Sequence, residues 1–227
     1  MATTRFEHPS AAPLTLLLPD LDGEGAGYWL RCWVDTRIDC RMVDLGQSRC
    51  PDRNSLVTRL DHAVRRADAP IILVGHGIGA LTIAAWAGLM SMESEAAVAG
   101  ALLIAPSDPN AADADPRLLA FAPLPSTVFS FPALVVASED DPVVSPDRAF
   151  SLARQWGAGF ARFGACGHFA PADGLGWWPE GEELLDRFAD LLEPGRAQAM
   201  RGIDHLAAAL PPRAAQPGPS LFRPRAG

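Results

Sequence analysis

Short apolar runs alternate along this chain with longer stretches in which apolar residues recur every three or four positions. The runs are four to six residues long and nearly continuous in apolar character, which is typical of strands buried on both faces of a parallel sheet. They predict six strands, at Leu14–Leu18, Cys40–Val43, Ile71–Gly75, Ala101–Ala105, Ala133–Ala137 and Gly159–Phe163.

The stretches between these runs have helical periodicity. Leu56, Leu60 and Val64 lie four apart on one face of a predicted helix, and Asp52 is placed to cap its start. The predicted helices are Asn54–Arg66, Gly79–Leu89, Asp147–Trp156 and Glu182–Leu192. This alternation predicts a three-layer α/β/α sandwich around a mostly parallel sheet of about six strands, joined by right-handed crossovers.

The two ends of the chain differ from its middle. We expect an N-terminal extension at 1–12, one domain at 13–193, and a tail at 194–227 rich in Pro, Arg and Ala. The tail carries five arginines and one acid, so its charge is +4 and the remaining body has a charge of −12. Its composition predicts partial disorder, with a short helix possible at 197–210.

Composition excludes several kinds of chemistry. All 19 basic residues are arginine, so chemistry that needs lysine, such as a P-loop or a Schiff base, is absent. The net charge of −8 argues against nucleic-acid binding. No apolar run approaches the 18–20 residues or so of a membrane span, and the first residues do not show the basic start and apolar stretch expected of a signal peptide. Four cysteines without metal-ligand spacing predict a reduced, cytoplasmic protein that needs neither metal nor cofactor.

The most informative segment is ILVGHGIGALTIAAWA at 72–87. A buried strand runs into Gly75, His76, Gly77, Ile78 and Gly79 and then into a helix of small residues. This is the context of a nucleophile elbow, in which flanking glycines permit a tight turn and close packing of the helix. The spacing does not fit the G-x-G-x-x-G dinucleotide motif. The centre of the elbow, where serine is expected, is Gly77.

Two further pieces follow in the order that a hydrolase triad requires. An acidic turn, Ser138-Glu139-Asp140-Asp141-Pro142, follows a predicted strand, and its aspartates could also serve as ordinary turn or cap residues. His168 lies in a glycine loop, GACGH, after the last predicted strand. The order elbow, acid, histidine differs from that of the chymotrypsin and subtilisin arrangements.

The chain resembles the small α/β-hydrolase-fold serine hydrolases of the YdeN-like, retinoblastoma-binding-protein type over roughly residues 13–193. The resemblance rests on VGHGIGAL at 74–81, GALLIAPSDP at 100–109, PALVVASEDDPVV at 132–144 and GACGHFAPADGLGWWPEG at 164–181. It implies an α/β-hydrolase fold and an esterase-like activity on a small-molecule ester. It also implies that Asp141 is the acid, His168 the general base, and the backbone N–H groups of Leu21 and Ile78 the oxyanion hole.

The sequence departs from this family at two places. The loop after the first strand, which usually opens Pro-Gly, reads Pro19-Asp20-Leu21-Asp22, and carboxylates near an oxyanion site would oppose a developing negative charge unless they point away. Gly77 supplies no nucleophile. We therefore expect esterase activity to be absent or severely reduced.

Three explanations of Gly77 stay open. It could be an engineered replacement, or it could mark a natural pseudo-hydrolase that binds a ligand or regulates a partner. The site could also use His168 and Asp141 as a base in different chemistry. Cys166 and Ser107 are weak candidates for a substitute nucleophile, and His76 is expected to point away from the nucleophile's direction. The substrate and the oligomeric state are not specified by the sequence.

Overall fold

A computed structural model describes residues 12–21, 23, 25, 27–46, 51–89 and 97–192. The predicted tail at 194–227, the possible helix at 197–210 and nearly all of the extension at 1–12 lie outside these residues. Six parallel strands form a single sheet in the order β2-β1-β3-β4-β5-β6. The strands are β1 (Leu14–Leu18), β2 (Cys40–Met42), β3 (Ile71–His76), β4 (Val98–Ile104), β5 (Ala133–Ser138) and β6 (Gly159–Phe163). All six predicted strands are therefore confirmed, with ends that shift by up to three residues.

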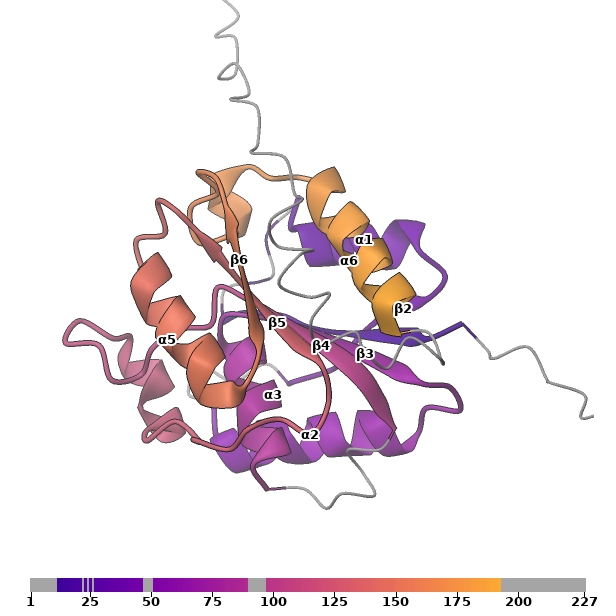
Figure 1. The fold of residues 1–227 in the computed structure, drawn as a ribbon, viewed down its shortest axis with the longest axis horizontal. Helices are drawn as coiled ribbons and strands as arrows, with labels where there is room; N and C mark the ends of the chain where they lie inside the picture. The colour runs from indigo at the N-terminus through magenta and orange to yellow at the C-terminus, as the bar shows by residue number, and fades with distance from the viewer. Residues whose placement is uncertain are drawn as a thin grey trace, which may run out of the picture.

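Helices cover both faces of this sheet, as the prediction of three layers requires (Figure 1). Figure 1 shows α1 and α6 on one face and α2 and α3 on the other, while α5 contacts β5 and β6. The helices are α1 (Trp29–Thr36), α2 (Arg53–Arg65), α3 (Ile78–Ala87), α5 (Pro146–Trp156) and α6 (Pro179–Leu192), with short 3-10 turns η1 (Pro116–Phe121) and η2 (Pro171–Asp173). Within the described residues, no helix has the length and apolar character needed to cross a bilayer.

Local sequence explains where several of these helices start. The Asp52 carboxylate accepts a hydrogen bond from the Ser55 N–H at 2.8 Å, so Asp52 is the cap that the sequence predicts. In the same way Ser145 caps α5 ahead of Pro146. Helix α1 was not predicted, because its preceding residue, Tyr28, gives no side-chain cap and its first turn contains no acid.

The core has two parts, one on each face of the sheet. Every residue of α3 is buried, as its uniform apolar composition predicts. On the other face Trp29, Trp33 and Trp178 pack ring against ring, with centroids 4.8–5.9 Å apart. These three side chains are at most 1% exposed, so their main role is to pack α1 against the segment that precedes α6.

The start of α3 lies so close to β1 that only glycine fits at position 79. A Cβ at Gly79 would overlap the carbonyl oxygen of Leu18 and would lie 2.8 Å from its carbonyl carbon. Both atoms belong to the backbone of a central strand, so they cannot move aside cheaply. This contact fixes α3 against the end of β1.

We therefore expect Gly79→Ala to lower the free energy of unfolding by about 1–3 kcal/mol through overpacking. Gly88→Ala, at the other end of the same helix, is the matched control, because the nearest atom to its Cβ would be a Pro125 side-chain carbon at 3.3 Å and its φ is −75°. Urea denaturation followed by tryptophan fluorescence measures both effects. Equal losses in the two variants would contradict this account of the contact.

Candidate active site

The turn after β3 has the geometry of a nucleophile elbow. β3 ends at His76, α3 begins at Ile78, and Gly77 between them has φ 53° and ψ −113°. The positive φ lies in the region that glycine adopts with least strain. The Gly77 N–H donates to the Ile104 carbonyl oxygen at 3.1 Å, which holds the turn at the carboxyl edge of the sheet. This is the edge at which open α/β sheets place their ligands.

The space beside Gly77 is filled by the side chain of Asp20, which lies in the loop after β1. A Cβ built at position 77 would overlap Oδ1 and Cγ of Asp20 and would lie 2.8 Å from Oδ2. The carboxylate therefore points into the site, where a serine side chain would begin. The sequence left open whether Asp20 faces this site, and the structure answers the question.

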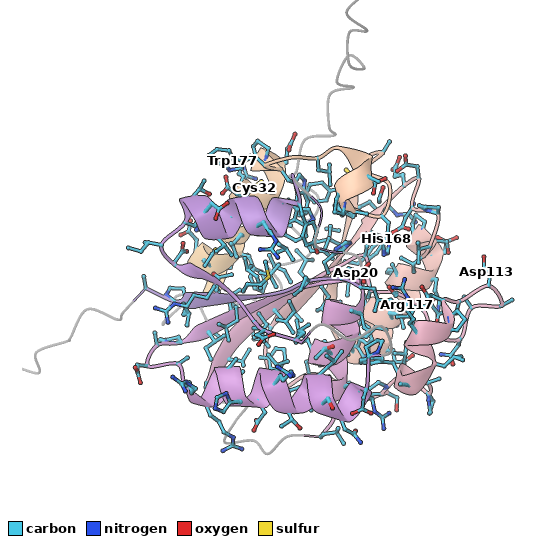
Figure 2. All side chains as sticks on the ribbon, turned by 180° about the vertical axis from the view of Figure 1, so that it is seen from behind. Asp20, Cys32, Asp113, Arg117, His168 and Trp177 are labelled. Atoms are coloured by element: carbon cyan, nitrogen blue, oxygen red, sulfur yellow. The ribbon has the colours of Figure 1, made fainter. Side chains whose placement is uncertain are left out.

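The two oxygens of Asp20 have different partners. Oδ1 accepts a hydrogen bond from the Ile78 N–H at 2.8 Å, so it occupies the backbone donor that the family resemblance assigns to the oxyanion hole. Oδ2 lies 3.6 Å from Nε2 of His168. Figure 2 shows Asp20 and His168 close together on the same side of the molecule. The side chain of Asp20 is 14% exposed and that of His168 is 9% exposed, so both are largely shielded from solvent.

His168 is held from its other side by Asp141. Its Nδ1 lies 2.9 Å and 3.0 Å from the two carboxylate oxygens of Asp141, which is fully buried at its side chain. The N–H groups of Val143 and Val144 donate to Oδ1 of Asp141 at 2.7 and 3.1 Å. The acid that the resemblance selects from the acidic turn is thus the one that contacts the histidine.

The loop that carries His168 is fixed by two other aspartates. Asp173 accepts hydrogen bonds from the N–H groups of His168 and Ala170 at 3.0 and 2.8 Å. Asp140 accepts one from the Gly167 N–H at 2.8 Å. The imidazole is therefore positioned by its backbone as well as by its own two ring contacts.

Two carboxylates flank the imidazole of His168, and this arrangement sets its protonation. Burial lowers the pKa of His168, but the hydrogen bond to Asp141, the interaction with Asp20 and both negative charges outweigh burial and raise its pKa to about 9. Burial would raise the pKa of Asp20, yet its interaction with His168 and its hydrogen bond from Ile78 hold that pKa well below its ordinary value. At neutral pH the site is an imidazolium ion between two carboxylates.

A second chain of hydrogen bonds ties the backbone of Asp20 to that of His168. Nε2 of His76 lies 2.6 Å from the carbonyl oxygen of His168, which can only accept, so Nε2 carries the proton. Burial lowers the pKa of His76, so its ring is neutral and Nδ1 accepts from the Tyr28 hydroxyl at 2.7 Å. The Tyr28 oxygen in turn accepts from the Asp20 N–H at 3.2 Å.

The same hydrogen bonds bear on metal binding. Among the described residues, Asp20, His76 and His168 bring possible ligand atoms within 4.8 Å of one another. Both ring nitrogens of His76 already have partners, Tyr28 and the His168 carbonyl, so this ring has no free lone pair to offer. The cluster is organised for hydrogen bonding, and the expectation of a site without metal stays a prediction.

The structure brings together most of the residues that the sequence singled out. Gly77, Ile78, Asp141 and His168 meet at one edge of the sheet. The side chain of His76 lies beside the site, where its ring nitrogens contact the Tyr28 hydroxyl and the His168 carbonyl oxygen, two partners that are distant in sequence. The proposed oxyanion role of the Leu21 N–H stays a prediction. Cys166 is buried, and its N–H donates to Ser138 Oγ at 2.9 Å.

Sequence reasoning missed Asp20 as an occupant of the site and Tyr28 as a member of this network, and it expected His76 to point away from the nucleophile's direction without assigning it these partners. A signal existed only for Asp20, whose presence in place of a glycine was noted as a departure from the family. Tyr28 is the single tyrosine of the chain, and nothing near it in sequence indicates a partner 48 residues away.

A family model for serine hydrolases matches residues 15–187. The chain belongs to the serine hydrolase family. Its structure is similar to that of a YdeN-like hydrolase from Pectobacterium atrosepticum, with a TM-score of 0.69 and 25% identity over 80% of this chain and 92% of that one. It is also similar to the ydeN gene product of B. subtilis, with a TM-score of 0.60 and 17% identity over 78% and 98% of the two chains.

A more distant neighbour of this serine hydrolase family member is the type II thioesterase BorB from the borrelidin biosynthetic cluster. The TM-score is 0.52 and the identity 19%, over 82% of this chain and 96% of that one. No curated protein sequence matches this chain. The α/β-hydrolase fold and the resemblance to YdeN-like hydrolases are therefore confirmed, and the family supports hydrolase function.

The raised pKa of His168 predicts how stability depends on pH. The ordinary pKa is 6.5 and the folded value is about 9, so the stabilisation by the charged ring is fully present below pH 6.5 and is lost as pH rises through about 9. This loss amounts to up to about 3 kcal/mol. Asp20→Asn removes one of the two flanking charges, so it should lower the pKa of His168 and reduce the loss.

Urea denaturation of both proteins across this pH range, together with NMR titration of the His168 ring, measures the effect. Coincident titration curves for the original chain and Asp20→Asn would contradict the assigned role of Asp20.

Proposed function

We propose that this member of the serine hydrolase family does not act as a serine esterase, so that hydrolysis of small acyl esters and related substrates is absent or severely reduced. The observation that carries the proposal is the overlap between any Cβ at position 77 and the carboxylate of Asp20. Gly77 has no hydroxyl to form an acyl-enzyme, and the space for one is already filled.

The oxyanion donor and the general base, which acyl transfer also needs, are likewise in contact with Asp20. The Ile78 N–H, which would have to stabilise the oxyanion of a tetrahedral intermediate, donates to Oδ1 of Asp20 instead. The charge of Asp20 would also repel that oxyanion. His168, with its pKa raised to about 9, is protonated at neutral pH and cannot accept a proton from an attacking group.

These obstacles set how low the activity should be. Enzymes that lose a member of the triad usually keep a residual acceleration of about 10³–10⁴ over water from the oxyanion hole and substrate binding. Here the oxyanion donor is occupied too, so esterase activity should fall below that residual level.

The mutual fit of Gly77 and Asp20 favours a site adapted to glycine over one that merely lost a serine. The alternative function, a natural pseudo-hydrolase that binds a ligand or regulates a partner, shares this feature. It differs in predicting that repair of both positions restores nothing, because the pocket has changed as well. A small-molecule substrate or ligand and a cytoplasmic location are part of the proposal and rest on the sequence.

The test is hydrolysis of p-nitrophenyl acetate by a set of four proteins. The original chain and Gly77→Ser should both be inactive, because the serine side chain would overlap Asp20. Asp20→Gly alone frees the oxyanion donor without supplying a nucleophile and should stay inactive. The double variant Asp20→Gly with Gly77→Ser should gain about 10²-fold or more over either single variant, and the gain should disappear with His168→Ala.

Asp20→Gly with Gly77→Ala is the matched control, since it adds the Cβ without the hydroxyl. Turnover by the original chain that is abolished by His168→Ala would refute the proposal. A folded double variant with no activity would favour the pseudo-hydrolase.

A further inference from the structure

Asp20 has the placement and charge of a nucleophile in its own right. Its low pKa keeps it ionised at neutral pH, its backbone is fixed through Tyr28, and Oδ1 is fixed by the Ile78 N–H. Oδ2 lies 3.6 Å from Nε2 of His168, and the Asp20 side chain retains 14% of its solvent exposure. Carboxylates held in this way form covalent intermediates in several enzyme classes.

The hydrogen bond from Ile78 decides which kind of carbon Asp20 can attack. Attack on an acyl carbon creates an oxyanion on the substrate, and that oxyanion needs the N–H that Oδ1 already occupies. In-line displacement at a saturated carbon creates no oxyanion on the substrate, so the occupied donor is no obstacle. The geometry therefore favours alkyl transfer over acyl transfer.

The position of His168 restricts the leaving group. His168 lies on the side of the nucleophile, whereas the leaving group in an in-line displacement departs from the opposite side of the carbon. The imidazolium cannot protonate it, so the group must leave as a stable anion, for example a halide. The exposed fractions of 14% for Asp20 and 9% for His168 restrict the substrate to small, unhindered molecules.

We infer that Asp20 is a displaced carboxylate nucleophile and that the site hydrolyses small primary alkyl halides to alcohols. This inference rests on the proposed function only in that Asp20, rather than a serine at position 77, fills the nucleophile's place. In the first step a lone pair of Asp20 Oδ2 forms a bond to the alkyl carbon. The carbon–halogen bond breaks, its electron pair leaves with the halide, and Asp20 becomes a neutral alkyl ester.

The ester changes the protonation of its neighbour. Formation of the ester removes the negative charge of Asp20, which is one of the causes that raise the pKa of His168. The imidazolium can then release its proton to solvent and become a base. Asp141 still orients the ring through Nδ1, at 2.9 Å. His168 thus becomes available as a base after the alkylation step, when hydrolysis of the ester needs it.

The second step returns the carboxylate. Nε2 of His168 takes a proton from a water molecule while the water oxygen attacks Cγ of Asp20. The carbonyl electrons move to Oδ1, where the Ile78 N–H stabilises the oxyanion. When this intermediate collapses, the Cγ–Oδ2 bond breaks, and the leaving alkoxide takes the proton from His168. Asp20 is then a carboxylic acid, and it passes its proton to the neutral His168, which restores the carboxylate and the imidazolium. The products are an alcohol, a halide ion and one proton, which balances the alkyl halide and water consumed.

Bromoethane and 1-bromobutane, with the full chain at neutral pH, are the probes. The original chain should release bromide and alcohol catalytically, whereas Asp20→Asn should release bromide no faster than protein-free solution. His168→Gln should form the ester but hydrolyse it about 10²–10⁴-fold more slowly. It should therefore release one equivalent of bromide in a burst, and mass spectrometry should find one alkyl group on the peptide that contains Asp20.

Asp35→Asn, at an exposed position of α1, is the matched control and should behave like the original chain. A single turnover in ¹⁸O-labelled water separates the covalent route from direct attack by water. The covalent route gives unlabelled alcohol and a labelled Asp20, while labelled alcohol would overturn the inference. Bromide release equal in the original chain and Asp20→Asn with both probes would also overturn it. Neither result depends on the ester assay, so failure of the two proposals can be told apart.

Discussion

The carboxylate of Asp20 fits into the space that glycine leaves at position 77, and the rest of the site is arranged around this contact. The placement of each residue depends on the other. Asp20 can enter only because position 77 has no side chain, and the elbow keeps a tightly filled interior only because Asp20 enters. The same carboxylate engages the Ile78 N–H and faces His168, so one side chain determines the nucleophile position, the oxyanion donor and the protonation of the base.

This contact is supported from outside the site. The fold brings the ends of β1, β3, β5 and β6 to one edge, and each contributes one part: Asp20, Gly77, Asp141 and His168. The chain of hydrogen bonds through Tyr28 and His76 links the backbone of the loop after β1 to that of the loop after β6. Burying an ion pair costs desolvation free energy, and its mutual attraction offsets that cost only when the partners are held in good geometry, as these hydrogen bonds hold them.

The sheet was predictable from sequence because its four inner strands are buried apolar runs, and the edge strands β2 and β6 are mostly apolar although each contains one exposed arginine. The elbow, the acidic turn and the histidine loop were predictable because their order follows the fold, whereas the choice of Asp141 within the turn came from the family resemblance. Helix α1 was missed because it lacks a cap and an acidic first turn, although Trp29, Leu30 and Trp33 form a buried stripe at helical spacing. The direction of the Asp20 side chain could not be predicted, since it depends on the space at a residue 57 positions later that is adjacent only in the folded chain.

The position of Tyr28 has an experimental consequence. It is the only tyrosine of the chain, it is buried, and burial raises the pKa of its hydroxyl well above 10. The ultraviolet absorbance of tyrosinate in this protein therefore reports on one hydroxyl, located midway between the two loops that build the site. Tyr28 is therefore a native spectroscopic probe, and breaking of the hydrogen bonds through Tyr28 and His76 can be followed without introducing any residue.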